Sequence, residues 1–279
     1  LLSNLEINRF SFEHYPHNKG TKTLFIWLPM SEWSEREQES LVQSLILLAK
    51  PFELELPPCR WVHVKNEDWS LSWKKSWKPD PVGKSILILP AWLEVPDKYS
   101  ERKIILLDPG SAFGTGSHPS TRLCIEALDN DPPVGKTIAD LGCGSGILSL
   151  TALKLGAKSI FAVDTDPLAI SATEINFALN NYPENLQNVF LGSIGELEIN
   201  IPEKKIDLML CNILAPVIKS LGPDFEKILG HNGKVILSGL LVKQITELQE
   251  FFFSLGWEVL DIQTMDQWAL MVITKNCLN

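Results

Sequence analysis

One segment, residues 137–166, constrains the fold of this chain more than any other. An apolar run at 137–141 is followed by three glycines, Gly142, Gly144 and Gly146. A helical pattern at 147–155, a second apolar run at 159–163 and an acid, Asp164, come next. Short apolar runs of this kind are typical of buried parallel strands, and a further glycine ends the helical pattern. The segment therefore predicts strand, tight turn, helix and strand in an open α/β sheet.

The turn and its two acids predict a nucleoside site. Ligands of such sheets bind at the carboxyl ends of the strands, where Asp164 is placed to accept hydrogen bonds from a ribose diol. A Cβ at Gly142, Gly144 or Gly146 would fill the space that a ligand needs. The spacing is G-x-G-x-G rather than the G-x-G-x-x-G of dinucleotide sites, and Asp140 would repel a pyrophosphate but suits an ammonium and a sulfonium. The segment resembles the glycine motif of class I S-adenosylmethionine-dependent methyltransferases.

Composition argues against several other classes of protein. With 279 residues, 45% of them apolar, the chain can bury a large core and hold a second, smaller domain. A formal net charge of -9 disfavours nucleic-acid binding, so no direct sequence-specific contact with nucleic acid is expected, although a basic protein partner is compatible. The cysteines form no C-x-x-C pair, and no apolar run approaches the roughly 20 residues needed to span a bilayer. We therefore expect a reduced, cytoplasmic protein without a metal site or a membrane contact.

Helices and strands alternate after residue 166. The expected elements are helices at 167–180, 216–229 and 242–255, strands at 189–191, 206–210, 234–237, 257–262 and 268–273, and a polar loop with Glu196, Glu198 and Glu203. The last two strands are separated by a short polar turn, so they pair as an antiparallel hairpin. The sequence predicts a Rossmann-like seven-stranded sheet that ends in this hairpin. Asn212, at the carboxyl end of the fourth parallel strand, should face the same crevice as Gly142 and Asp164.

The N-terminal part predicts a small α+β domain. A strand at 23–28 is followed by an amphipathic helix that ends near Lys50, and a further strand is expected at 60–64. The helix begins with a capping box of Ser34 and Glu37. These elements form half of a ferredoxin-like sandwich.

We divide the chain into the small domain at 1–65, a linker region at 66–100 and the large domain at 101–279. Residues 1–7 fit the remnant of a helix with no strand before it, and the chain begins with leucine, so we expect the small domain to be incomplete at its start. The linker contains a stripe with a period of four: Trp69, Trp73 and Trp77. On a helix these rings would share one face, where packing between domains is favoured over contact with a partner or a nucleic acid.

A glycine-rich loop and a helix start lie at 108–122. Ser120 or Thr121 can open this helix, whose free N–H groups suit a carboxylate such as the one on the methionine end of S-adenosylmethionine. His118 invites a catalytic interpretation. A single histidine in a glycine loop, without an acidic or cysteine partner at a telling spacing, is more often a brace for the loop.

Several motifs in a fixed order resemble the PrmA family, the methyltransferases of large-subunit ribosomal protein eleven. The motifs are Glu67-Asp68-Trp69 with Trp73 and Pro79, Leu107 to Gly110, Phe113 to Gly116 with His118, Pro119 and Thr121, Asp140 to Leu148, and Asn212 to Ala215. The resemblance covers about residue 67 to the C-terminus. It implies an N-terminal substrate-recognition domain, a linker, and a catalytic domain that methylates the N-terminal α-amine and lysine ε-amines of that protein. Two features depart from the family: Ser120 stands where threonine is common, and the N-terminal domain looks shorter.

The resemblance also implies which residues serve the cofactor, S-adenosylmethionine. Carried over by position, these are Thr121, Gly142, Asp164 and Asn212, with Phe113 and Thr115 on the loop around its methionine end, and the glycine motif adds Gly144 and Asp140. The attacking amine must be neutral, although a lysine has a reference pKa of about 10.4. We expect Asn212 to be catalytic by accepting a hydrogen bond from this amine; alternatively, it only shapes the turn.

Three other interpretations stay open. An NAD-dependent oxidoreductase would share the α/β sheet, although Asp140 and the glycine spacing disfavour it. A methyltransferase could act instead on another protein amine or on a glutamine amide. A non-catalytic binding protein could retain the same fold, although the intact Gly142, Asp164 and Asn212 disfavour that interpretation.

Overall fold

A computed structural model describes residues 10–14, 22–26, 33–50, 59–62, 77–108, 114, 116–182, 187–201 and 206–275. The chain forms two compact units, Leu1–Trp69 and Ser70–Asn279, each of which is described by itself. No described helix is both long enough and apolar enough to span a bilayer.

The described residues of the first unit form a two-stranded antiparallel sheet and a helix. Strand β1 (Phe10–His14) pairs with β2 (Lys22–Ile26), and helix α1 spans Glu35–Ala49. The predicted capping box is confirmed, because a Glu37 side-chain oxygen accepts from the Ser34 backbone N–H at 2.7 Å. Strand β1 was not predicted. The strand expected at 60–64 is wrong for 60–62, which have no regular structure, while 63–64 and the helix expected at 1–7 lie outside the described residues.

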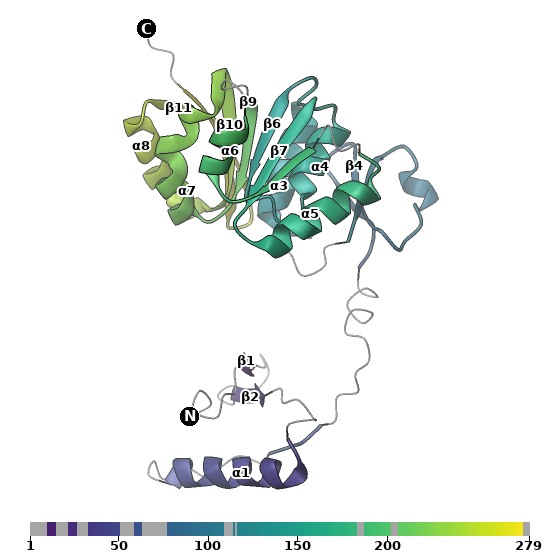
Figure 1. Cartoon of the computed structure of the whole chain (residues 1–279), viewed down its shortest axis with the longest axis vertical. Helices are drawn as coiled ribbons and strands as arrows, with labels where there is room; N and C mark the ends of the chain where they lie inside the picture. Colours follow the sequence, from purple (N-terminus) through teal and green to yellow (C-terminus); the bar gives the residue numbers. More distant parts are fainter. Residues whose placement is uncertain are drawn as a thin grey trace. The chain divides into compact units, whose positions relative to one another are not determined.

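The second unit is built on a sheet of seven strands in the order β11-β12-β10-β9-β6-β7-β8. Figure 1 shows its central strands β10, β9, β6 and β7 side by side. The strands are β6 (Thr137–Leu141), β7 (Ser159–Asp164), β8 (Gln187–Leu191), β9 (Ile206–Asn212), β10 (Leu229–Leu241), β11 (Trp257–Met265) and β12 (Trp268–Lys275). Strands β6 to β10 pair in parallel, whereas β12 is antiparallel to both β10 and β11. The predicted class I methyltransferase architecture with a C-terminal antiparallel hairpin is confirmed.

Helices cover both faces of this sheet. They are α3 (Pro119–Asn130), α4 (Ile147–Lys154), α5 (Pro167–Leu179), α6 (Ile194–Asn200), α7 (Ala215–Leu221), α8 (Ile245–Ser254), and the 3-10 turns η5 (Gly222–Lys227) and η6 (Val242–Gln244). Successive residues of β9 enter opposite cores: Leu208 and Leu210 pack with residues of α3 and α4, while Met209 and Cys211 pack with residues of α6 to α8. This alternation is expected of a parallel strand that is buried on both faces.

Two predicted elements differ from the structure. The polar loop expected at Glu196 and Glu198 is helix α6, because Ile194, Leu197 and Ile201 fall on one buried face; Glu203 lies outside the described residues. The helix expected at 216–229 ends as an α-helix at Leu221. Pro223 follows it and lacks the backbone N–H that would continue the α-helical hydrogen bonds, so the chain continues as η5 and the next strand starts at 229.

A small sheet packs beside α3, α4 and α5. It consists of β3 (Asp80–Val82), β4 (Ile86–Pro90) and β5 (Lys103–Leu107), with β4 antiparallel to β3 and parallel to β5, and a 3-10 turn, η3 (Asp97–Tyr99), in the connection. Arg122 of α3 holds β3 through Asp80 at 2.8 Å. Trp77 is not in a helix, and the other two tryptophans of the stripe lie outside the described residues. The domain boundaries at 65 and 100 stay a prediction.

Candidate functional site

The glycine loop, residues 142–146, turns sharply between β6 and α4. Gly142, Gly144 and Gly146 have φ angles of +80°, +56° and +76°, a region that L-residues with a side chain rarely adopt. The Gly142 N–H donates to the Val163 carbonyl at 2.9 Å, which ties the loop to β7. A Cβ on Gly142 would lie 2.5 Å from Cγ2 of Ile213, so the chain after β9 passes too close for a side chain here.

Asp164 ends β7 and lies beside this loop. One carboxylate oxygen accepts from the Gly144 N–H at 3.0 Å, and the other accepts from the Asp166 N–H at 3.0 Å. The side chain is partly exposed. Each carboxylate oxygen has two lone pairs, so each can still accept one more hydrogen bond, and a pair of vicinal hydroxyls is a fitting donor.

Asp140 lies beneath the glycine loop rather than beside an exposed edge. Asp140 is only 1% exposed. Its Oδ2 accepts hydrogen bonds from the backbone N–H and the hydroxyl of Ser149, at 3.1 and 2.6 Å. Burial raises the pKa of Asp140 to about 6, and the neighbouring charge of Asp164 adds to this, while the bonds from Ser149 oppose it. Asp140 is turned toward the first turn of α4, where Ser149 binds it, and its role as a cofactor-binding residue stays a prediction.

Asn212 and Thr121 meet on the other side of β6. Asn212 is the last residue of β9, and its Nδ2 donates to Oγ1 of Thr121, a buried residue in the first turn of α3, at 3.2 Å. The end of β10 approaches closely here, because a Cβ on Gly239 would lie 2.5 Å from the Ile213 carbonyl oxygen. Two residues that lie 91 positions apart in the sequence are thus joined by a side-chain hydrogen bond.

The start of α3 lies two or three residues before the expected one. His118, not Ser120 or Thr121, is the N-cap, and its Nδ1 accepts from the Ser120 N–H at 3.3 Å. The imidazole also packs edge-on against Trp268 with ring centroids 4.5 Å apart, and the Ser238 hydroxyl donates to the Ser120 carbonyl at 2.9 Å. These contacts favour the bracing role of His118 over a catalytic one.

The structure therefore gathers the predicted residues at the carboxyl edge of three neighbouring strands. Asp164 contacts Gly144, Asn212 contacts Thr121, and Gly142 lies against the residue after Asn212. Phe113 and Thr115 lie outside the described residues. The residue between them, Gly114, accepts a bond from the buried Ser145 hydroxyl at 2.6 Å, so this point of the loop lies against the glycine loop.

Sequence reasoning missed three buried polar residues that fix the glycine loop. Ser149 holds Asp140, as described above. On α5, Thr173 donates to the Gly144 carbonyl at 3.0 Å, and Asn176 donates to the Ser145 carbonyl at 2.9 Å. All three are 0% exposed. Their signal was a polar side chain at a position where the helix period requires an apolar one.

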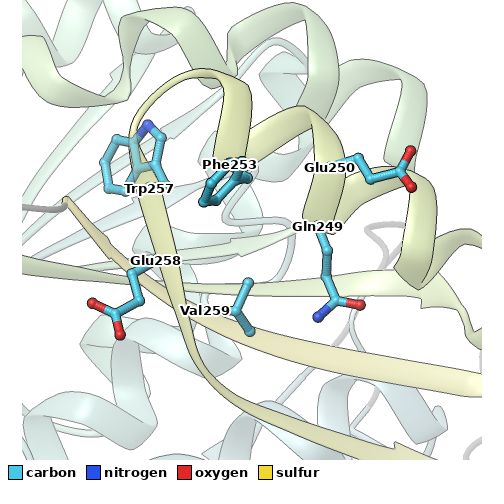
Figure 2. A pocket seen from close by; sticks show the side chains of 6 residues that line it. All are labelled: Gln249, Glu250, Phe253, Trp257, Glu258 and Val259. Atoms are coloured by element: carbon cyan, nitrogen blue, oxygen red, sulfur yellow. The ribbon is translucent and has the colours of Figure 1, made fainter.

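A hollow of about 480 Å³ lies elsewhere, between α8 and the edge strand β11 (Figure 2). It is lined by Gln249, Glu250, Phe253, Trp257, Glu258 and Val259. None of these is a predicted site residue, and β11 is separated from β6 by β12, β10 and β9. This hollow is therefore not the site that the glycine loop builds.

Comparisons with known proteins agree with this geometry. A profile of the PrmA family, described as ribosomal protein L11 methyltransferase, matches residues 14–276. The match thus includes most of the N-terminal unit and begins well before residue 67. Two proteins named ribosomal protein L11 methyltransferase are similar to this chain: one from Parasynechococcus marenigrum is 51% identical over 98% of this chain and 95% of its own length, and one from Prochlorococcus marinus (strain MIT 9313) is 48% identical over 98% and 91%.

One solved structure is also similar along its whole length. The ribosomal protein L11 methylase from Lactobacillus delbrueckii subsp. bulgaricus superposes with a TM-score of 0.65 at 29% identity, over 72% of this chain and 100% of that one. The chain belongs to the PrmA family of ribosomal protein L11 methyltransferases.

Proposed function

We propose that this protein transfers methyl groups from S-adenosylmethionine to amino groups of ribosomal protein L11, namely its N-terminal α-amine and lysine ε-amines. Membership of the PrmA family supports this substrate. The observation that carries the proposal is the pair of side-chain contacts around the glycine loop: Asp164 with Gly144 on one side and Asn212 with Thr121 on the other.

The residues at this edge fit the cofactor. The positive φ angles of Gly142, Gly144 and Gly146 require glycine in this loop, and a Cβ would also meet Ile213 at Gly142 and Thr173 at Gly146. Asp164 binds the ribose hydroxyls through the remaining lone pairs of its carboxylate. The carboxylate of the methionine end binds at the start of α3 through the Thr121 hydroxyl and the positive end of the helix dipole, because the N–H groups of Ser120, Thr121 and Arg122 already donate to His118. Phe113 and Thr115 complete this end.

The protein's own residues act mainly by positioning and by keeping the amine neutral. When bound, S-adenosylmethionine supplies a methyl group on a positively charged sulfur. Asp164, Thr121 and the glycine loop would hold the cofactor with this methyl carbon in line with the amine nitrogen, and the proton that the amine loses on methylation would pass to solvent. Holding the two reactants in line is worth several kcal/mol, roughly 7 at the low end for well-oriented reactions. Asn212 accepts a hydrogen bond from the amine through Oδ1, since its Nδ2 is engaged by Thr121.

The domain assignment forms part of the proposal. Residues 1–65 form the domain that recognises the substrate, residues 66–100 form the linker region, and residues 101–279 form the catalytic domain. The net charge of -9 is compatible with a basic protein substrate. We place this activity in the cytoplasm, where ribosomal proteins are made and disulfides are rare.

A labelling experiment tests the proposal. The protein is incubated with labelled S-adenosylmethionine and ribosomal proteins from methyl-deficient cells, and the labelled product is digested and sequenced by mass spectrometry. Label on amines of L11 supports the proposal; label on another protein or on a glutamine amide replaces it with the alternative substrate. A thermal-shift comparison of S-adenosylhomocysteine with NADH checks the cofactor independently, because only the true ligand raises the melting temperature.

A further inference from the structure

Helix α5 and its C-cap carry three polar side chains on one stripe that all bind backbone groups of other segments. Thr173, Asn176 and Asn180 are spaced by three and four residues, so they share one side of the helix. Thr173 and Asn176 are fully buried. Asparagine and threonine are poor helix formers, and burying them is costly unless their hydrogen bonds are satisfied. The stripe therefore needs a reason beyond the stability of α5 itself.

The first half of the stripe binds the glycine loop. Thr173 donates to the Gly144 carbonyl at 3.0 Å, and Nδ2 of Asn176 donates to the Ser145 carbonyl at 2.9 Å. Gly144 is the residue whose N–H donates to Asp164 at 3.0 Å. Both backbone polar groups of Gly144, its N–H and its carbonyl, thus form hydrogen bonds with side chains.

The second half of the stripe binds the edge of β5 and the start of the next loop. Asn180 accepts from the Leu106 N–H at 2.9 Å and donates to the Leu106 carbonyl at 2.8 Å. The Oδ1 of Asn176 accepts from the Asp108 N–H at 2.8 Å. Since β5 is an edge strand, these asparagines take the place of a further strand along this part of it.

Asn176 is therefore the one residue of the stripe that binds both loops. Its amide spans the distance between Ser145 and Asp108 with two bonds of normal length, and its two ends cannot be exchanged, because one is a donor and the other an acceptor. A second link between the same loops, from Ser145 to Gly114, lies six residues further along the loop after β5. The two links together set the separation of the loops at two points.

We propose that Asn176 is a positioning residue of the methyl-transfer site, which sets the separation between the glycine loop and the loop that follows β5. This inference rests on the proposed function, because the methionine end of the cofactor is taken to lie between these loops. Asn176 acts through Ser145 and Asp108 and does not itself touch a reactant. Thr173 supports it by fixing Gly144.

The test compares Asn176→Leu with Asn180→Leu, a control at the C-cap of the same helix. Both variants replace an asparagine that binds β5 or its end, but only Asn176 also binds the glycine loop. Isothermal titration with S-adenosylhomocysteine should give a Kd raised about tenfold in Asn176→Leu, the effect of losing about one hydrogen bond to a site group. The Kd of Asn180→Leu should stay within about twofold of wild type. Equal Kd values for the two variants would overturn the proposal.

Two further measurements distinguish positioning from a general loss of stability. Amide exchange, measured without any ligand, should accelerate at both Asp108 and Gly144 in Asn176→Leu but only at Leu106 in Asn180→Leu. Steady-state kinetics at saturating cofactor and L11 should show a lower kcat for Asn176→Leu and an unchanged kcat for Asn180→Leu. Exchange confined to Asp108, or an unchanged kcat in Asn176→Leu, would contradict the inference.

The conservative variant Thr173→Val covers the case in which Asn176→Leu does not fold. It keeps the size of the side chain and removes the hydroxyl that binds the glycine loop at the Gly144 carbonyl and at the Cys143 sulfur. A severalfold higher Kd for S-adenosylhomocysteine together with faster amide exchange at Gly144 supports the inference. A wild-type Kd together with wild-type amide exchange at Gly144 overturns it. If wild type itself does not bind S-adenosylhomocysteine, the proposed function fails, whereas the exchange data still decide whether Asn176 joins the loops.

Discussion

Replacing Asp140 with asparagine should stabilise the protein in a strongly pH-dependent way. Asp140 is buried, and its pKa rises from an ordinary 3.8 to about 6, chiefly because burial disfavours its charged form. The native state therefore holds this proton more tightly than the unfolded state. As the pH rises from about 4 to about 6, the native state loses stability relative to the unfolded chain, and above pH 6 the full cost of the buried charge remains.

The size of the effect follows from these two values. A difference of about two pH units corresponds to about 3 kcal/mol, since each unit is worth about 1.4 kcal/mol. Linkage then predicts that Asp140→Asn exceeds wild type in free energy of unfolding by about 1 kcal/mol at pH 4.5 and about 3 kcal/mol at pH 7. The asparagine oxygen can still accept both hydrogen bonds from Ser149. Urea denaturation followed by circular dichroism at four or more pH values measures this difference.

Ser149→Ala provides the opposing control. It removes the hydroxyl donor that lowers the pKa of Asp140, so the cost of the charge should grow and the variant should be less stable than wild type above pH 6. If Asp140→Asn and wild type showed the same dependence of unfolding free energy on pH from 4.5 to 7, the assignment of a strained buried charge at Asp140 would be refuted.

Three further substitutions test other parts of the structure. Gly142→Ala should weaken binding of S-adenosylhomocysteine at least tenfold in a calorimetric titration. The φ of +80° costs a residue with a side chain about 1–2 kcal/mol, and the new Cβ would meet Ile213. Unchanged affinity would argue against the loop as the binding site. Asn212→Ala should lower kcat by roughly 100-fold, which is the usual effect of removing an acid–base or electrostatic group. The Kd for S-adenosylhomocysteine should change less. Wild-type turnover together with a wild-type Kd would exclude a catalytic role for Asn212. Phe225→Ala should lower the free energy of unfolding by about 3–5 kcal/mol, because this buried ring packs on the ring of Phe252, with centroids 6.0 Å apart. The protein that stays folded should keep its Kd for S-adenosylhomocysteine. A loss below 1 kcal/mol would contradict this packing.

The central part of the fold could be predicted because its signals are local. The glycines after β6, the apolar runs and the short turn before β12 each depend on neighbouring residues only, and they yielded the parallel strands and the final hairpin. Local signals were also misread. Pro119, favoured at the first position of a helix, indicated that the N-cap is His118, and Ile194 with Leu197 indicated α6 despite the glutamates between them.

Other features depend on contacts between distant residues, which one sequence does not encode. Asn176 reads as an ordinary polar residue of a helix until Asp108, which lies 68 positions away, is placed against it. The bond from Asn212 to Thr121 and the burial of Asp140 are of the same kind. Strand β3 was missed because Pro81 opposes strand formation, yet an edge strand tolerates it.

The place of β12 in the sheet has a consequence for biosynthesis. This strand, Trp268–Lys275, lies between β10 and β11, and four of its residues are fully buried. A nascent chain that has emerged only as far as β11 lacks the strand that joins β11 to β10, so it exposes two unpaired strand edges. The seven-stranded sheet therefore reaches its full pairing only once β12 has left the ribosome, and until then the open edges of β10 and β11 are free to pair with other chains.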